Sequence, residues 1–572
     1  MQHFAKNKLA ALLIFLGSIS WSLTMVKSGF PYSFGLGFWG PNGHDGVWHV
    51  ALINQLAQNL SWQINMPVFS GIPLQNYHIG FDYLLALINK VTAIPAHILY
   101  FQIIPPMLAV AIGVLTYKFI FLWRKSKAQA LWATFFVYFG GGWGWVVTFL
   151  RDGNIGGESM FWAQQAVSTL VNPPYAASLV LLLLGLISLV NYLKNREVKY
   201  LLIAGFIFAV TIEVKVYGGL MGLGGLGVVG ILGLLRNKDY KLFLGFICSS
   251  VFSYFIFSFL TKTSGNLVIL QPFWFLETMM AISDRVGWQK YFDAMTAYKS
   301  GGNLIKLIPA YIVAFLIFWF GNLGTRAIKD VWLIKNIKKV GLVEMFMVSI
   351  VIAGVLIPTL FLQKGTPWNT IQFLYYSLFF SSILAGVAVG EFLESKRKIY
   401  DISIYQIAIL LVIVLTVPTT LSTLWQHYIP SRPPAMISNE EVEALKFLSK
   451  HPTGVVLTFP FDRKLAEKAQ NNPPRPLYLY ESTAYVSAFS KKPVFLEDEV
   501  NLVITDYPWE ERREKVLAWL DNLDEKQAYD FLRENNISYI YWIKGQRARL
   551  GETQLGISRL FENKQVDIYK VD

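Results

Sequence analysis

LAALLIFLGSISWSLTM, residues 9 to 25, is an uninterrupted apolar run that follows Lys6 and Lys8. Its length is close to the roughly 20 residues that cross a bilayer as a helix. The run resembles a signal peptide, but no small-residue cleavage site of the A-x-A kind comes after it. We therefore expect an uncleaved first membrane span, and the rest of the chain repeats the pattern.

The composition agrees with a membrane protein. Of the 572 residues 54% are hydrophobic and 15% are charged, and the mean hydropathy is +0.42, whereas soluble domains usually carry about 25% charged residues. The net charge of +13 indicates Lys and Arg in cytoplasmic loops rather than nucleic-acid binding. Cys248 is the one cysteine, so no intrachain disulfide forms and redox chemistry is not expected.

Apolar stretches predict about eleven spans. They lie at 9–28, 98–122, 128–149, 175–193, 200–215, 217–235, 242–260, 304–323, 341–362, 372–392 and 402–422. Basic clusters follow the even-numbered spans, at 124–127, 194–199, 236–241, 326–339 and 396–398. Because basic loops stay in the cytoplasm, we expect a multi-pass plasma-membrane protein with a cytoplasmic N-terminus and an extracytoplasmic C-terminus.

The loop after the first span is expected to be long and external. GFDYLLALINKV, residues 80–91, is about a dozen residues long, which favours an interfacial or re-entrant helix over a span. Residues 29–97 then form one external loop of a membrane domain that covers 1–422.

Residues 423–572 have the composition of a soluble domain. SNEEVEALKFL opens with Ser438 and Glu441 at capping-box spacing. GVVLTFPF, KPVFLE and ISYIYWI predict strands, and WEERREKVLAWLDNL and DEKQAYDFLRENN predict helices. The expected fold class is therefore mainly α, a polytopic helix bundle with a small extracytoplasmic α/β or α+β domain.

The first external loop contains GPNGHDGVWHVALINQLAQ, residues 40–58, with an aspartate between two histidines. A helix that begins near Asp45 places Asp45 and His49 on one apolar stripe, so the carboxylate is expected to face packed protein. An acid there needs a function or a partner. The simpler interpretation is an acid in the first helical turn, stabilised by the helix dipole by about 0.3–1 kcal/mol.

Two further hypotheses concern the same loop. His44, Asp45 and His49 have ligand types that suit a divalent metal ion, although no C-x-x-C or H-E-x-x-H motif accompanies them. His78 and Asp82 are also four residues apart, ahead of the short apolar helix. They either cap an interfacial helix or form a second wall of the same site, together with His44 and His49.

TIEVKVYGG, residues 211–219, places charges at membrane depth, where they are functional candidates. Lys215 is either paired with Glu213 or holds a lipid phosphate as a point charge, with Gly218 and Gly219 leaving room for a headgroup. Arg285 and Lys364 add basic groups from other external loops.

This layout resembles the GT-C superfamily of membrane glycosyltransferases over residues 1–422. The resemblance rests on a first span, a long external loop with Asp45 in NGHDGVWH, an interfacial helix pair and many later spans. It implies that Asp45 is the catalytic base and that the donor is a polyprenyl-phosphate-linked sugar whose phosphate is held by Lys215, Arg285 and Lys364. It also implies an extracytoplasmic acceptor, which is a protein, a lipid or a glycan.

The chain lacks the paired Asp-Glu of the mannosyltransferases and the W-W-D-Y-G of the oligosaccharyltransferases, so the sugar and the acceptor stay open. We expect a hexosyl- or pentosyltransferase that needs no cofactor unless the metal hypothesis holds. The alternatives are a membrane transporter or lipid flippase and a non-catalytic relative with a scaffold role. Against a transporter, the spans show no pair of corresponding broken helices in two halves of the chain.

Overall fold

The computed structural model describes residues 8–260, 268–396 and 402–572. Packing divides the chain into two compact units. The helical unit comprises Met1–Thr24, Pro105–Ser258 and Gly265–Ile429, and the mixed unit comprises Met25–Ile104, Phe259–Ser264 and Pro430–Asp572. Lys6, Arg397 and Lys398, which belong to the basic pattern of the sequence, lie outside the described residues.

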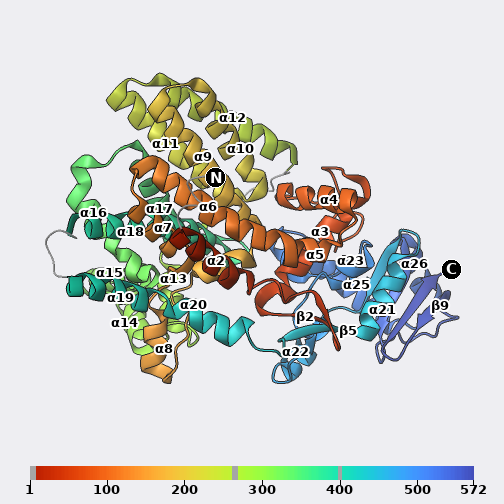
Figure 1. Ribbon diagram of the computed structural model, residues 1–572. Coiled ribbons are helices and arrows are strands. Elements are labelled where there is room, and N and C mark those ends of the chain that lie inside the picture. Colours follow the sequence, from red (N-terminus) through yellow and green to blue (C-terminus); the bar gives the residue numbers. More distant parts are fainter. Residues whose placement is uncertain (1–7, 261–267, 397–401) are drawn as a thin grey trace. The chain divides into compact units, whose positions relative to one another are not determined.

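The helical unit is built from long apolar helices (Figure 1). Its helices are α2 (Lys8–Ser22), α6 (Ile104–Arg124), α7 (Lys127–Phe139), α8 (Gly144–Asp152), α9 (Pro173–Asn195), α10 (Val198–Val214), α11 (Val216–Asn237), α12 (Tyr240–Leu260), α13 (Trp274–Ala281), α14 (Gln289–Ser300), α15 (Leu304–Leu323), α16 (Ile328–Asn336), α17 (Leu342–Leu360), α18 (Gln372–Lys396), α19 (Ile402–Thr416) and α20 (Pro418–Thr423). Short helical turns are η3 (Ala166–Val171), η4 (Gly324–Ala327), η5 (Ile337–Lys339), η6 (Pro367–Ile371) and η7 (Leu424–Tyr428), and β3 (Val268–Leu270) pairs with β4 (Phe361–Gln363).

The chain is a multi-pass membrane protein. Within the described residues eight helices are long and apolar enough to cross a membrane, or nine if α7 and α8 count as one span. These eight coincide with eight of the predicted spans. The other three predicted spans differ: α2 has 15 residues, α10 has 17 residues, and 128–149 is broken into α7 and α8 with a 45° bend.

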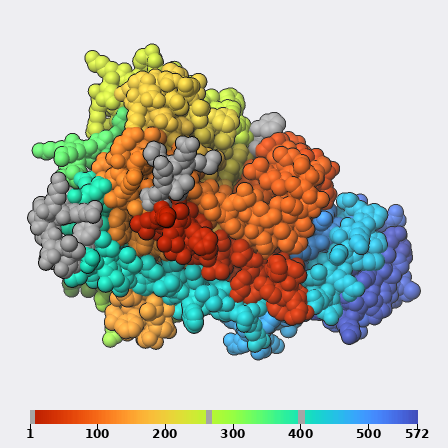
Figure 2. Space-filling view, in the orientation of Figure 1, coloured from red at the N-terminus to blue at the C-terminus, as the bar shows by residue number. Residues whose placement is uncertain are grey.

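The first helix, α2, lies on the surface of the helical unit (Figure 2). One face is buried and includes Trp21, whose indole N–H donates to the Tyr138 carbonyl at 2.9 Å. A Cβ at Gly17 would meet the Tyr138 ring at 2.2 Å, so glycine permits this close approach. The opposite face exposes Leu9, Leu12, Phe15, Leu16 and Ile19, which suits contact with lipid.

Three helix breaks meet inside the helical unit, where α7, α15 and α19 end. Gly324 has φ +57°, and a Cβ there would meet the Gly141 carbonyl oxygen at 2.1 Å. The Gly142 carbonyl accepts a hydrogen bond from the Thr419 hydroxyl at 3.2 Å. Glycines let backbone pack on backbone here, and the freed polar groups find partners inside the protein, as a broken membrane helix requires.

The basic run 326–339 is not a solvated loop throughout, because Arg326 and Lys329 are 1% and 0% exposed. The run folds as η4, α16 and η5. Arg326 donates to the carbonyl groups of Leu323 at 2.9 Å and Asn322 at 2.6 Å, and to the side-chain oxygen of Gln165. The guanidinium thus satisfies carbonyl groups that α15 leaves without partners at its end.

The mixed unit contains two sheets and short helices. From residues 25–104 it takes β1 (Phe30–Tyr32), β2 (Gly35–Phe38), η1 (Gly40–Gly43), α3 (Asp45–Asn59), α4 (Gly80–Thr92), α5 (Ala96–Ile98) and η2 (Leu99–Ile103). From the C-terminal part it takes β5 (Ala435–Ser438), α21 (Asn439–Ser449), β6 (Val455–Thr458), α22 (Arg463–Ala469), β7 (Arg475–Pro476), η8 (Leu477–Leu479), α23 (Tyr485–Ser490), α24 (Glu499–Ile504), α25 (Trp509–Asp521), α26 (Glu525–Glu534), β8 (Ile537–Ile543), β9 (Ile557–Glu562) and β10 (Val566–Val571).

The external loop and the C-terminal part fold together. β2 pairs antiparallel with β5, placing Leu36 opposite Ile437, in a sheet of order β1-β2-β5-β7. Farther along, the Val494 N–H donates to the Pro67 carbonyl at 2.8 Å. By packing, residues 25–104 therefore belong with 430–572. The predicted boundary between residues 422 and 423, which follows the composition, stays a prediction.

The C-terminal part contains the predicted small α/β or α+β fold. A second sheet has the order β6-β8-β10-β9, with β6 parallel to β8 and β10 antiparallel to both of its neighbours. Ser438 and Glu441 form the expected capping box at the start of α21. KPVFLE is not a strand, because only its Val494 makes an isolated parallel bridge, to Val456. Figure 1 shows the helices α21 and α26 beside β9.

The short apolar segment of the external loop is the helix α4. It buries Phe81 and Leu85 and leaves Leu84 53% and Val91 78% exposed. Such an amphipathic helix suits the membrane surface, and its interfacial position stays a prediction.

Candidate functional site

The candidate site is built on α3 of the mixed unit. A 3-10 turn with Pro41 near its start leads into α3, which begins at Asp45. The apolar stripe predicted for this helix is buried, and it contains Trp48, His49, Leu52, Ile53 and Leu56. The helix ends at Leu60, whose φ of 47° places it in the left-handed region.

Asp45 departs from the expectation that it faces packed protein. Its side chain is 51% exposed, and one carboxylate oxygen lies 2.7 Å from Nδ1 of His44. His44 is the residue that is buried, at 5% exposure. The first turn of α3 thus presents a carboxylate that contacts the buried His44 ring and remains accessible to solvent.

His44 lies between two carboxylates. Its Nε2 is 3.2 Å from an oxygen of Asp498, which is 0% exposed. Burial alone would lower the pKa of His44, but the charges and hydrogen bonds of Asp498 and Asp45 outweigh it and raise this pKa well above its ordinary value. The imidazole is therefore charged at neutral pH, and both ring nitrogens donate hydrogen bonds.

Asp498 is fixed by its own segment. It adopts the left-handed conformation, with φ 54°, and caps α24 by accepting from the Asn501 N–H at 3.1 Å. The Asn501 amide donates to its other oxygen at 2.8 Å. Sequence reasoning missed this residue. The signal in the sequence is the acidic triplet at 497–499, directly after the apolar run KPVFL.

A second histidine–carboxylate pair joins α3 to α4. His49 Nδ1 lies 2.8 Å from an Asp82 oxygen, and both side chains are buried. Tyr77 lies near both acids: burial first, and then the charges of Asp82 and Asp45, raise the pKa of its hydroxyl well above the ordinary value. The His78 ring stacks on Tyr77, with centroids 4.8 Å apart. His49 and Asp82 thus meet, and the four predicted lining residues all belong to this unit.

His44, Asp45 and His49 are not gathered into a metal site, because His49 bonds to Asp82 and His44 lies between two carboxylates. Across the described ranges of the chain, no group of three or more His, Cys, Asp or Glu side chains suits a metal ion.

A further acid, Glu481, lies beside the Asp45 cluster and was also missed. Burial raises its pKa, the charges of Asp45 and Asp498 add to this, and that of His44 opposes it. The neighbouring Tyr480 hydroxyl donates to the Gly40 carbonyl at 3.2 Å, which ties this segment to the turn before α3.

In the helical unit, Lys215 is the single residue between α10 and α11. It is 6% exposed, and its ammonium lies 5.5 Å from the centroid of the Tyr217 ring. The expected headgroup space at the glycines is absent: a Cβ at Gly218 would meet the Tyr376 hydroxyl at 2.8 Å, and one at Gly219 would meet Ile212 at 2.5 Å. These glycines permit helix packing instead.

The other two basic candidates lie in different surroundings. Lys364 is exposed, and its neighbour Gln363 accepts a hydrogen bond from the Tyr217 hydroxyl at 3.3 Å. Tyr217 thus lies near Lys215 and hydrogen-bonds to the residue that precedes Lys364. Arg285 instead donates to Ser159 at 3.2 Å and lies over the Trp162 ring at 4.5 Å.

Comparison with known proteins identifies the fold. No family model matches the chain, and no curated protein matches it. Among solved structures, the Archaeoglobus fulgidus oligosaccharyltransferase tethered with an acceptor peptide is 11% identical, with TM-score 0.51, over 94% of this chain and 69% of that one. The mycobacterial arabinofuranosyltransferase AftD is 11% identical, with TM-score 0.52, over 98% of this chain and 41% of that one.

Both of these neighbours are GT-C glycosyltransferases. The chain therefore has the GT-C fold, a polytopic helical membrane part with a small sheet-containing C-terminal part. It spans about two fifths of AftD.

Proposed function

We propose that this chain is an integral-membrane glycosyltransferase that moves a sugar from a polyprenyl-phosphate-linked donor to an extracytoplasmic acceptor. The observation that carries the proposal is the half-exposed Asp45 carboxylate, held by a buried and charged His44 that is itself anchored by Asp498. The GT-C fold supports the class of reaction, since one neighbour is an oligosaccharyltransferase and the other an arabinofuranosyltransferase.

The chemistry needs a proton acceptor. In an inverting transfer, the acceptor hydroxyl oxygen forms a bond to the anomeric carbon while the bond from that carbon to the phosphate oxygen breaks. The hydroxyl proton passes to Asp45 as general base, and the electron pair leaves with the lipid phosphate. His44 lies between the two carboxylates and orients Asp45 through the contact of its Nδ1, while the Asp45 side chain stays half exposed.

The remaining candidates take supporting roles in the proposal. His44 orients Asp45, and His49, His78 and Asp82 line the acceptor side. A cation stabilises the charge on the departing phosphate. Lys215 is the first candidate because it is buried at a helix junction. Lys364 follows Gln363, which accepts a hydrogen bond from Tyr217 beside Lys215. Arg285 is the second.

The proposed transfer takes place outside the cytoplasm. The basic clusters of the sequence support a cytoplasmic N-terminus and place Asp45 and residues 423–572 on the outer side of the plasma membrane. Nucleotide sugars are not available there, which is the reason for a lipid-linked donor.

Asp45→Asn tests the base. The chain in phosphatidylcholine nanodiscs is given a panel of short-chain polyprenyl-phosphate hexoses and pentoses, and sugar release is measured. We expect the substitution to lower the rate about a hundredfold or more, the usual scale for a lost general base, with donor binding kept. Glu511→Gln is the matched control, because the Glu511 side chain is 69% exposed and pairs with Lys515 on the surface. Near-normal turnover in Asp45→Asn would exclude this role.

A further inference from the structure

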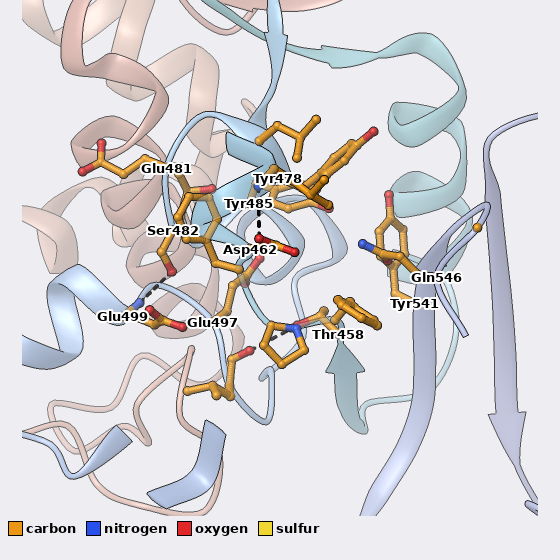
Figure 3. A pocket seen from close by; sticks show the side chains of 18 of the residues that line it. Thr458, Asp462, Tyr478, Glu481, Ser482, Tyr485, Glu497, Glu499, Tyr541 and Gln546 are labelled. Atoms are coloured by element: carbon orange, nitrogen blue, oxygen red, sulfur yellow. Dashed lines mark hydrogen bonds between the residues drawn. The ribbon is translucent and has the colours of Figure 1, made fainter. Parts of the chain in front are cut away.

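A groove crosses the C-terminal part of the mixed unit. Its central part is a cavity of about 290 Å³ lined by residues from 458–465, 478–485, 496–499 and 541–547. Figure 3 shows Tyr541 and Gln546 on one side of this cavity and Glu481 and Ser482 on the other. Its polar lining consists of tyrosines, four carboxylates, hydroxyls, the Gln546 amide and one arginine, Arg547, and apolar side chains complete it.

The cavity lies at the carboxyl ends of parallel strands. β6 is parallel to β8, and Val494 makes a parallel bridge to Val456 of β6. The segments that leave these strands at 459–462, 496–499 and 545–547 all line the cavity. In α/β sheets the carboxyl ends of parallel strands are where ligands bind.

The groove continues in both directions. A second cavity, of about 500 Å³, shares Phe461, Glu481, Ser482 and Glu499 with the first. A third, of about 1110 Å³, shares Phe459, Gly545 and Gln546 with it. A continuous groove of this extent suits a chain of several units rather than one small molecule. Its Glu481 end is the end nearest to His44 and Asp45, whose charges act on Glu481.

Most of the carboxylates around the central cavity have structural roles. Glu497 accepts from the N–H groups of Val486 and Ser487 at the start of α23. Asp462 caps α22, and Glu499 pairs with Arg513. Glu481 has no hydrogen bond or ion pair to any other described residue. Its carboxylate is thus available as an acceptor for a ligand.

One buried hydroxyl also points to a ligand. Thr483 is 3% exposed and lines the central cavity, and its Oγ1 has no hydrogen-bond partner among the described residues. A buried hydroxyl without a partner costs about 1–3 kcal/mol, and a bound hydroxyl group would supply one. Around the central cavity the four carboxylates outnumber the one arginine, Arg547, and this excess of negative charge disfavours phosphates and other anions. Hydroxyl-rich ligands, in contrast, both donate to carboxylates and stack on tyrosine rings.

We propose that this groove binds a neutral carbohydrate chain, from the third cavity through the central one to Glu481. This inference rests on the proposed function: the bound carbohydrate is the acceptor glycan, and the end of the glycan at Glu481 presents a hydroxyl to Asp45. The groove would thereby select the acceptor, while the Asp45 cluster performs the transfer.

Direct binding tests the groove without turnover. The full chain in phosphatidylcholine nanodiscs, which contain no sugar-based detergent, is titrated with gluco-, manno-, galacto- and arabino-oligosaccharides of about six units. Saturation-transfer NMR identifies the ligand, and calorimetry gives its Kd. We expect Thr483→Val to weaken binding about five- to tenfold and Glu481→Gln about tenfold or more, the scale of one lost hydrogen bond, neutral or charged.

The controls separate binding from folding and from catalysis. Thr483→Val should leave Tm unchanged or raised, because valine removes a hydroxyl without a partner, and Thr553→Val, at an exposed position, should bind as wild type. Asp45→Asn should keep the Kd even where turnover is lost. If Asp45→Asn stays active while Thr483→Val raises the acceptor KM, the result contradicts the role of Asp45 as general base. The same result supports the groove as the acceptor-binding site. Failure of every oligosaccharide to bind, or binding of basic peptides in their place, would overturn the groove proposal.

Discussion

Two buried cations, one in each unit, are neutralised in different ways. His44 of the mixed unit lies between the carboxylates of Asp45 and Asp498. Arg326 of the helical unit donates instead to two backbone carbonyl groups and the Gln165 amide, and no ion pair with a described residue accompanies these bonds. Both residues are at most 5% exposed.

The difference separates a site for chemistry from a structural support. The Asp45 carboxylate beside His44 is half exposed, so a substrate can reach that pair. Arginine stays charged, and the Nε and Nη2 groups of Arg326 donate to protein acceptors at the end of α15, where three broken helices meet. Burial of charge alone therefore does not mark a catalytic residue. What distinguishes the two cations is the group that each contacts and whether that group is exposed to solvent.

The largest effect is expected at the structural cation. Arg326→Met removes the donors that the carbonyls of Asn322 and Leu323 use, so buried acceptors lose their partners. We expect a loss of about 3–5 kcal/mol, the scale for breaking a buried charged contact, seen as a lower melting temperature in fluorescence-detected size-exclusion chromatography. Arg236→Met, in an exposed last turn of α11, is the control. A stable Arg326→Met protein that has lost donor binding would instead make Arg326 a ligand residue.

Lys215 extends the comparison to a third buried cation. If it holds the donor phosphate, Lys215→Ala removes a charge-assisted contact worth about 1.5–3 kcal/mol. Affinity for a short-chain polyprenyl-phosphate sugar should then fall about ten- to a hundredfold, and Lys215→Arg should retain part of it. Arg285→Ala, at a cation that lies over Trp162, should change it less. Equal affinity of wild type and Lys215→Ala would move the phosphate site elsewhere.

The sequence predicts those features that depend on local pattern. Apolar runs identify eight spans, and the spacing of Ser438 and Glu441 identifies a helix start, because both signals lie within a few turns of one helix. The break after Phe139 was missed, since the run around it is apolar throughout. The breaks also weaken the sequence argument against a transporter, because that argument rested on spans that look unbroken in the sequence.

The rest depends on contacts between distant segments. Asp45 and His44 are visible in the sequence, but Asp498 lies more than four hundred positions away, and no local pattern connects them. The pairing of β2 with β5 brings the two stretches together. The exposure of Asp45 was wrongly predicted for the same reason. Helical periodicity predicts which residues share a face of the helix, but the segment around Glu481 and Asp498 determines which side chain at the start of α3 is covered.

The smallest effect is expected at Asp498, the residue that keeps His44 charged. Asparagine is also a good N-cap, so Asp498→Asn should keep α24 and the fold while removing one negative charge from the surroundings of His44. The pKa of His44 should then fall by about one pH unit, the low end of the range for a lost neighbouring charge, because the Asp45 carboxylate remains. A histidine whose pKa is raised in the folded state stabilises the fold fully at pH values below its unfolded-state pKa. This stabilisation is lost as the pH rises through the folded-state pKa, so in the variant the loss should begin at a lower pH.

The same change should appear in catalysis. With His44 neutral, Asp45 loses its charged partner, so the alkaline limb of the kcat/KM profile should move to lower pH. The rate at a pH above this limb should fall about tenfold for each pH unit by which the limb moves. Imidazole ¹⁵N chemical shifts measured with labelled histidine, and assigned to His44 through His44→Gln, should follow the same curve. Glu511→Gln should leave both unchanged. An Asp498→Asn enzyme that is slower at every pH, with an unaltered His44 titration, would show that Asp498 acts on the fold and not through the charge of His44.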